Sequence, residues 1–194
     1  MSKQQNKIHE ELKNFIVNVG WTHKIHIVRS DEYSGYSNAF KIVRIIIAAL
    51  TSSGLIGILF IEGSYILTLA TAILSFTTVA MNSLDKAVDY DKLSLKEKTD
   101  ANNFWELRIE AESLLHDTVF NTKNMNEIEK KFIELKRLRK QYNDGLLNVP
   151  NRTVNKACKL INERKDNDYS NDYIKFIAPD LLYLKAEDDS DEIE

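Results

Sequence analysis

Few side chains in this sequence have the types and spacing that catalysis or metal binding requires. His23 and His26 are three residues apart, so a helix presents both imidazoles on one side, but no carboxylate or cysteine stands at a matching local spacing. Cys158, the single cysteine, has no neighbouring base that would activate a thiolate. Gly54 and Gly57 lie inside an apolar run, so we expect them to be a helix-packing feature and not part of a phosphate-binding loop. We therefore expect packing or surface roles for the histidines, no metal or other cofactor, and no enzymatic activity.

A stripe of polar side chains is a stronger pattern. Its six members recur at spacings of four, three, four, three and four residues: Ser64, Thr68, Thr71, Ser75, Thr78 and Asn82. This 3.5-residue period places them on one face of a helix, over a length of about 27 Å. Because hydrocarbon solvates polar groups poorly, the face must meet protein or water. Two interpretations stay open: an intramolecular seam against a partner helix, or the polar wall of an oligomeric pore.

The stripe belongs to an apolar region long enough to cross a membrane twice. Residues 45–84 carry one charge, Glu62, which separates a span at 45–61 from a span at 65–84. Helices of these lengths reach about 26 and 30 Å, close to the thickness of a hydrocarbon core. A buried hairpin in a soluble protein is the alternative, but the core helices of soluble proteins usually keep one polar face, and neither span keeps charges on any face. We predict a transmembrane hairpin.

A row of small residues runs along the first span at four-residue spacing: Ala49, Ser53 and Gly57. Such rows let helix backbones approach closely inside a membrane, where the hydrophobic effect does not drive association. We therefore expect this row to be a helix-packing surface.

Basic residues flank the hairpin on one side. Lys41 and Arg44 precede the first span, the turn between the spans has none, and four lysines follow the second span: Lys86, Lys92, Lys96 and Lys98. The positive-inside rule places both termini in the cytosol. Residues 1–11 are polar and lack the apolar region of a signal peptide, and a lone cysteine fits a reducing compartment.

The overall charge argues against a nucleic-acid binder. Lysine and arginine total 26 against 29 acids, for a net charge of −3. Six acids fall within residues 187–194, so removing them leaves +3 on residues 1–186, without the strong basic excess of a dedicated binder. Six glycines and two prolines leave little turn chemistry for an all-β fold, so the chain is predicted to be all-α.

The segment before the membrane predicts an amphipathic helix over 7–29, followed by a loop at 31–38. One apolar face holds Ile8, Leu12, Phe15 and Val19, and a second holds Val17, Trp21, Ile25 and Val28. Two apolar faces exceed what a lone helix buries, so we expect contacts between copies there. The candidates for this oligomer interface are Leu12, Phe15, Val19, Trp21 and His26.

The segment after the membrane predicts further helices. The capping-box spacing of Ser94 and Glu97 opens one that runs to about residue 119. Asn124 opens the next, which ends at 143–145 and carries an apolar stripe of Ile128, Phe132, Leu135 and Tyr142. Shorter helices are expected over 151–164 and 171–184, and the acidic tail, 187–194, is expected to be disordered.

A basic cluster in the second of these helices has two interpretations. Its members are Lys130, Lys131, Lys136, Arg137, Arg139 and Lys140. The cluster either forms a solvated face paired with nearby glutamates (Glu127, Glu129 and Glu134) or attracts anionic lipid headgroups or a nucleotide.

This arrangement resembles the SLATT family: a helical head (residues 1–40), a tight membrane hairpin (41–84) and a longer helical tail (85–186). Two short stretches carry the resemblance, Trp21-Thr-His-Lys-Ile-His26 in the head and Leu50-Thr-Ser-Ser-Gly54 in the first span. The acidic tail, 187–194, has no counterpart in it. The all-α architecture covers nearly the whole chain.

The resemblance implies a homo-oligomeric effector of the bacterial inner membrane that acts in anti-phage and other conflict systems. Such effectors are thought to permeabilise the membrane and halt the infected cell, which is abortive infection. The expected partners are membrane lipid and a separate sensor: a nucleotidyltransferase, a SLOG-type ligand reader or a reverse transcriptase, acting directly or through a small-molecule signal. The alternative function is a non-conducting membrane scaffold that anchors a partner enzyme.

Overall fold

The computed structural model describes residues 3–60 and 64–166, which form five α-helices and no strand. The helices are α1 (Lys3–Phe60), α2 (Tyr65–Val88), α3 (Tyr90–Phe120), α4 (Met125–Asn143) and α5 (Asn151–Asn162). The predicted all-α fold is confirmed. The chain divides into two compact units, Met1–Val154 and Asn155–Glu194, and the apolar core belongs to the first. The helix predicted at 171–184 and the acidic tail lie outside the described residues.

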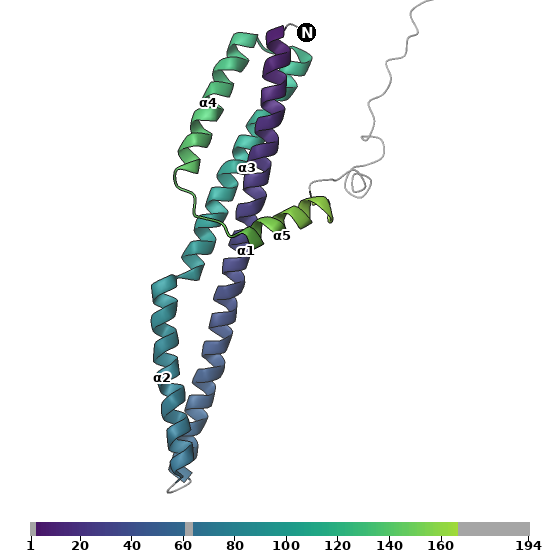
Figure 1. Ribbon diagram of the computed structural model, residues 1–194. Helices are drawn as coiled ribbons and strands as arrows, with labels where there is room; N and C mark the ends of the chain where they lie inside the picture. The colour runs from purple at the N-terminus through teal and green to yellow at the C-terminus, as the bar shows by residue number, and fades with distance from the viewer. Residues whose placement is uncertain (1–2, 61–63, 167–194) are drawn as a thin grey trace, which may run out of the picture. The chain divides into compact units, whose positions relative to one another are not determined.

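The first helix is continuous over 58 residues, about 87 Å by the α-helical rise. It lies beside α2 at one end and beside α3 at the other (Figure 1). The loop predicted at 31–38 is therefore wrong. Its serines, glycine and aspartate favour turns, but tertiary partners override that preference: Ser37 is buried, and Glu32 accepts a hydrogen bond from Thr153 (2.6 Å).

The return path of the chain breaks at a single residue. Asp89 adopts a left-handed conformation (φ 46°), ends α2 and begins α3, and its side chain accepts a hydrogen bond from the Lys92 backbone N–H. The helix start predicted at Ser94 is wrong, because this cap opens the helix one turn earlier. Ser94 instead pairs with Ser30 on α1: each hydroxyl lies 2.9 Å from the other's backbone carbonyl oxygen and donates to it.

The apolar core lies where α1, α3 and α4 meet. Both predicted stripes enter it, from α1 (Ile8, Leu12, Phe15, Val19) and from α4 (Ile128, Phe132, Leu135), and α3 supplies Phe104, Leu107, Ala111 and Leu114. The second apolar face predicted on α1 is only partly correct, since Val28 is buried but Val17 is 59% exposed. The ends of α4 fall where the sequence predicts, with Asn124 capping its first turn.

Gly35 offers a test of the continuous helix. It is exposed, and a Cβ built on it meets nothing within 4 Å. Because glycine in an exposed helix interior costs about 0.5–1 kcal/mol relative to alanine, Gly35→Ala should stabilise the chain by that amount. Thermal unfolding of the detergent-solubilised protein measures the change. A loop at 31–38 would give no gain, so an unchanged or lower midpoint contradicts the continuous helix.

Candidate functional site

The apolar segments of α1 and of the α2–α3 run are exposed. Both are long and apolar enough to cross a membrane. The most apolar segment of α1 has a mean hydropathy of 1.7, and that of α2 and α3 together has a mean hydropathy of 1.5. Of those two segments, 0% and 6% are buried inside the chain, which excludes a buried hairpin as their setting. The large exposed side chains include Ile45, Ile46, Leu50, Leu55, Ile56, Ile66, Leu69, Ile73 and Phe76. An apolar surface of this extent requires lipid around it.

Two glycines of α1 lie directly against α2. A Cβ on Gly54 would overlap the hydroxyl of Thr71, and a Cβ on Gly57 would lie 3.2 Å from Leu67 Cδ2. Of the predicted packing row, Gly57 lies against α2, whereas Ala49 and Ser53 are exposed. Gly54, which the sequence marks together with Gly57 as a packing feature, is the glycine that faces Thr71.

The polar stripe of α2 divides between the seam and the surface. Thr71 is 4% exposed between the helices, and its hydroxyl donates to the Leu67 carbonyl oxygen (2.8 Å). Of the other five, Ser64, Ser75 and Thr78 are half-buried, whereas Thr68 and Asn82 are exposed. Thr71 thus lies in an intramolecular seam, and Thr68 and Asn82, on either side of it along the stripe, are open to other molecules.

Two ion pairs join α1 to the return path on either side of Asp89. Arg44 Nη1 lies 2.9 Å from Asp85 Oδ2 on α2, and Lys41 Nζ lies 2.7 Å from Asp91 Oδ2 on α3. The hydrogen bond from Lys41 lowers the pKa of Asp91. These contacts hold α1 against both helices across the break.

An aromatic cluster surrounds the same junction. The ring of Tyr90 lies 6.1, 5.7 and 5.6 Å from the rings of Tyr33, Tyr36 and Phe40 (centroid to centroid). Aromatic rings concentrate where a membrane meets water, and here they adjoin two ion pairs and two exposed apolar spans. The junction marks one boundary of the hydrocarbon-facing region.

Beyond this boundary, the α1–α3 interface contains a buried pair of a histidine and a glutamate. His26 Nδ1 lies 2.5 Å from Glu97 Oε2, and the two side chains are 4% and 0% exposed. The ring of Phe104 stacks on His26 (6.4 Å, 9°), and the second oxygen, Glu97 Oε1, has no hydrogen-bond partner among the described residues. The sequence patterns missed this pair, although Glu97 shares its four- and three-residue spacing with buried Ala101 and Phe104.

His23 occupies a neighbouring position in the same interface. Its Nδ1 lies 2.9 Å from the Ala101 carbonyl oxygen, and its ring packs on Trp105 (5.1 Å). Burial, the larger effect, lowers the pKa of His23, so the ring is neutral and Nδ1–H donates to the carbonyl. Across the residues that the structure describes, no three His, Cys, Asp or Glu side chains gather as metal ligands would.

The residues predicted to join copies instead hold this chain together. Leu12, Phe15 and Val19 lie in the apolar core, and His26 is paired with Glu97; Trp21 is half-buried. The faces of Leu12, Phe15, Val19 and His26 are thus used within one chain, whereas Trp21 keeps an accessible surface and its part in an interface between copies stays a prediction.

The basic cluster of α4 also differs from its predicted pairing. Lys136 pairs with Glu11 of α1 (Nζ–Oε2 2.7 Å), and Arg139 donates to Asn18 (2.7 Å). Among the described residues, the predicted partners on α4 (Glu127, Glu129 and Glu134) make no ion pair with the cluster. Two of its cations thus fasten α4 to α1, and the others make no ion pair within the described part of the chain.

A family comparison accounts for this combination of a lipid-exposed hairpin and a helical bundle. The model of the SMODS and SLOG-associating 2TM effector domain family 4 matches residues 8–172. The chain belongs to this family. The SLATT resemblance is thereby confirmed, and the two transmembrane segments of the family's description correspond to the two exposed apolar segments. The match begins within α1, continues through α5 and ends before the acidic tail. Comparison with curated proteins and with solved structures gives no match.

The glycine seam predicts a steric effect of a single methyl group. Gly54→Ala should destabilise the hairpin by about 1–3 kcal/mol, because the new Cβ overlaps Thr71. Adding Thr71→Ala removes the obstructing hydroxyl and should recover much of the loss. Ser53→Ala, on the exposed side, is the control. Membrane abundance and the thermal midpoint in detergent report the effect, and a Gly54→Ala protein as stable as its parent would contradict the seam.

The buried pair predicts a rescue by a second mutation. His26→Leu leaves the buried Glu97 carboxyl group without its hydrogen-bond partner and should cost about 1–3 kcal/mol. His26→Leu with Glu97→Leu removes both polar groups and should be more stable than His26→Leu alone. Thermal midpoints of the three proteins test this expectation. If the double variant is no more stable than the single one, the pair is not buried as described.

Proposed function

We propose that this protein is an oligomeric effector of the bacterial inner membrane that permeabilises it in an abortive-infection type of defence. Its membership of a two-transmembrane effector family supports the membrane role. The observation that carries the proposal is the exposure of the hairpin: only Thr71 is buried in α2, so two helices enclose no water path of their own. Passage of ions then requires several copies around a shared path.

The polar stripe supplies the wall of that path in this proposal. Thr68 and Asn82, which are exposed, and the half-buried Ser64, Ser75 and Thr78 are its lining candidates. Thr71 contributes by fixing the hairpin through Gly54. A polar face directed at water avoids the cost of placing these groups in lipid.

The proposed orientation places both termini in the cytosol. Lysines and arginines flank the same end of the hairpin, where Lys41 and Arg44 pair with α3 and α2. We propose that residues 1–40 and 85–186 work as cytosolic parts of one effector around the membrane segment, 41–84. The helices α1 and α2 both continue past the edges of that segment, so motion in the cytosolic part reaches the membrane through α1.

The proposed trigger comes from a separate sensor. The family's description names association with SMODS and SLOG proteins, which supports a nucleotidyltransferase or a SLOG-type ligand reader as the partner. A reverse transcriptase or the sensor's small-molecule product is the alternative source of the signal. Membrane lipid and further copies of this chain complete the proposed assembly.

One observation favours the scaffold alternative. The hydroxyls of Thr68, Thr71 and Thr78 all donate to carbonyl oxygens four residues earlier in the chain (3.1, 2.8 and 2.9 Å). Hydroxyl groups whose hydrogen bonds are made within their own helix are compatible with lipid, so these threonines do not require a water path. A non-conducting anchor for a partner enzyme is therefore the second candidate function.

Replacing the exposed ends of the stripe separates the two functions. Thr68→Leu with Asn82→Leu should dewet a pore wall, and loss of membrane potential after induction in bacteria should fall several-fold. Protein abundance should hold, because neither side chain is buried. Ser52→Leu with Ser53→Leu, on the exposed side of α1, is the matched control. An undiminished loss of potential in the stripe variant rules out lining by these residues, and no loss with the parent protein favours the scaffold.

A further inference from the structure

Unpaired cations lie on the outward face of α4. The side chains of Leu135, Leu138 and Tyr142 face the core, which turns Arg137 and Lys140 away from α3. Both are exposed, and within the described part of the chain neither makes an ion pair. Ile133, one turn before Arg137, is 60% exposed. This face therefore combines positive charge with an uncovered apolar side chain.

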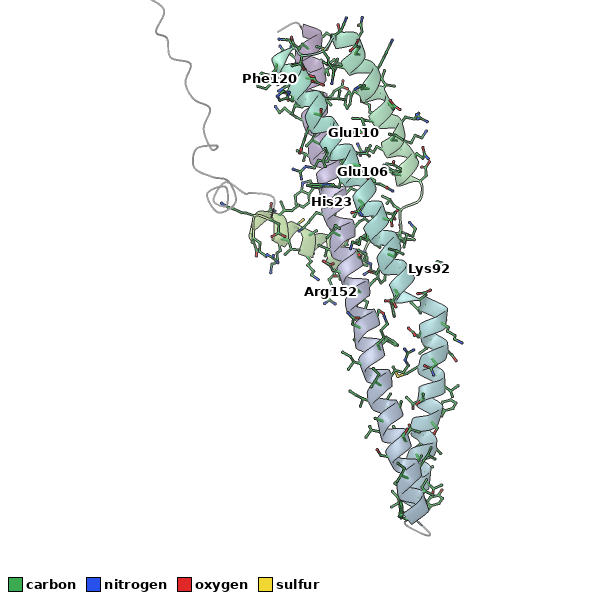
Figure 2. The ribbon with its side chains drawn as sticks, turned by 180° about the vertical axis from the view of Figure 1, so that it is seen from behind. His23, Lys92, Glu106, Glu110, Phe120 and Arg152 are labelled. Carbon is green, nitrogen blue, oxygen red and sulfur yellow. The ribbon has the colours of Figure 1, made fainter. Side chains whose placement is uncertain are left out.

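Unpaired carboxylates lie on α3. Glu106 and Glu110 are exposed, lie one turn apart along α3 (Figure 2), and make no ion pair with any residue that the structure describes. Ile109 lies beside them in the sequence and is 49% exposed. This second face has the opposite charge and the same kind of apolar side chain.

The two faces lie at the same level along the bundle. Tyr142 of α4 packs on Phe104 of α3 (ring centroids 6.3 Å), and Leu138 lines the same cavity, of about 430 Å³, as Glu110. Residues 137–140 therefore lie level with residues 106–110. Copies held in one membrane by the same hairpin share one height and one direction. The cations of one copy then face the carboxylates of its neighbour without any vertical shift.

We propose that neighbouring copies join head to tail through these faces, with Arg137 and Lys140 of one copy against Glu106 and Glu110 of the next. Ile133 and Ile109 contribute the apolar part of the contact. The inference deepens the proposed function, since it identifies the surface through which the oligomer forms. Because this contact joins two different faces, a pair of copies still has one free basic face and one free acidic face. Further copies therefore add until the assembly closes into a ring or extends as a row.

The energetics fit a contact that depends on the membrane. Exposed ion pairs are individually weak and are screened by salt, so they contribute orientation more than affinity. Confinement of the copies to one bilayer raises their effective concentration and makes a weak, specific contact sufficient. We expect the oligomer to shrink in mild detergent at high salt and to persist in the membrane at low salt.

Reversing each face separately tests the contact. Variant one carries Arg137→Glu and Lys140→Glu; variant two carries Glu106→Lys and Glu110→Lys. Each alone brings like charges together, so chemical cross-linking of the full chain in membranes should yield several-fold less oligomer. Co-expression of the two should restore the yield, because each reversed face then meets its reversed counterpart. Arg152→Glu with Lys159→Glu, two exposed cations of α5 that belong to neither face, makes the same change of charge; it is the matched control and should cross-link like the parent.

The outcomes separate this contact from the proposed function. Cross-linking that is unchanged in both variants, or that is not restored by co-expression, overturns the contact, as does a parent protein that is monomeric in the membrane. Loss of membrane potential is measured in the same cells. A parent that cross-links through these faces without dissipating the potential upholds the contact and contradicts permeabilisation.

Discussion

The structure depends on the packing of α3 against one uninterrupted helix. Over 58 residues, α1 lies against the second membrane span through Gly54 and against α3 through the core. A helix that long gains its stability from tertiary burial more than from its own propensity. If α1 bent at residues 31–38, the ion pairs that hold α2 and α3 on either side of Asp89 would lose their common partner.

The α1–α3 interface changes character along its length. Far from the membrane it is apolar, with Leu12, Phe15 and Phe104 in the core; nearer the membrane it holds His26, Glu97 and the Ser30–Ser94 pair. Apolar packing tolerates small shifts in the register of two helices, whereas buried polar groups find their hydrogen-bond partners in only one register. The polar part thus fixes how α3 aligns with α1 just before the chain enters the membrane. In the proposed assembly, this alignment sets the levels at which residues on α3 and α4 meet a neighbouring copy.

The sequence predicted the features that local periodicity determines. These features are the apolar stripes of α1 and α4, the cap at Asn124 and the two membrane spans. Each depends on residues a few positions apart, so the spacing of side-chain types predicts which residues are buried and which are exposed. The sequence did not predict features that depend on distant residues. Residues 31–38 are helical because Ser37 and Glu32 have tertiary partners, and Glu97 is buried because His26, 71 positions away, faces it. The sequence marks Gly54 as a packing residue but not its partner, because the rotation of α1 against α2 decides that Gly54 faces Thr71.

In the proposed function, copies of this hairpin together open a path for ions. Electrical recording of the purified full-length protein in a planar bilayer of bacterial lipids measures this most directly. We expect discrete current steps whose frequency rises more steeply than in proportion to protein density, because several copies form each path. A bilayer that stays silent while cross-linking shows inserted oligomers would contradict it.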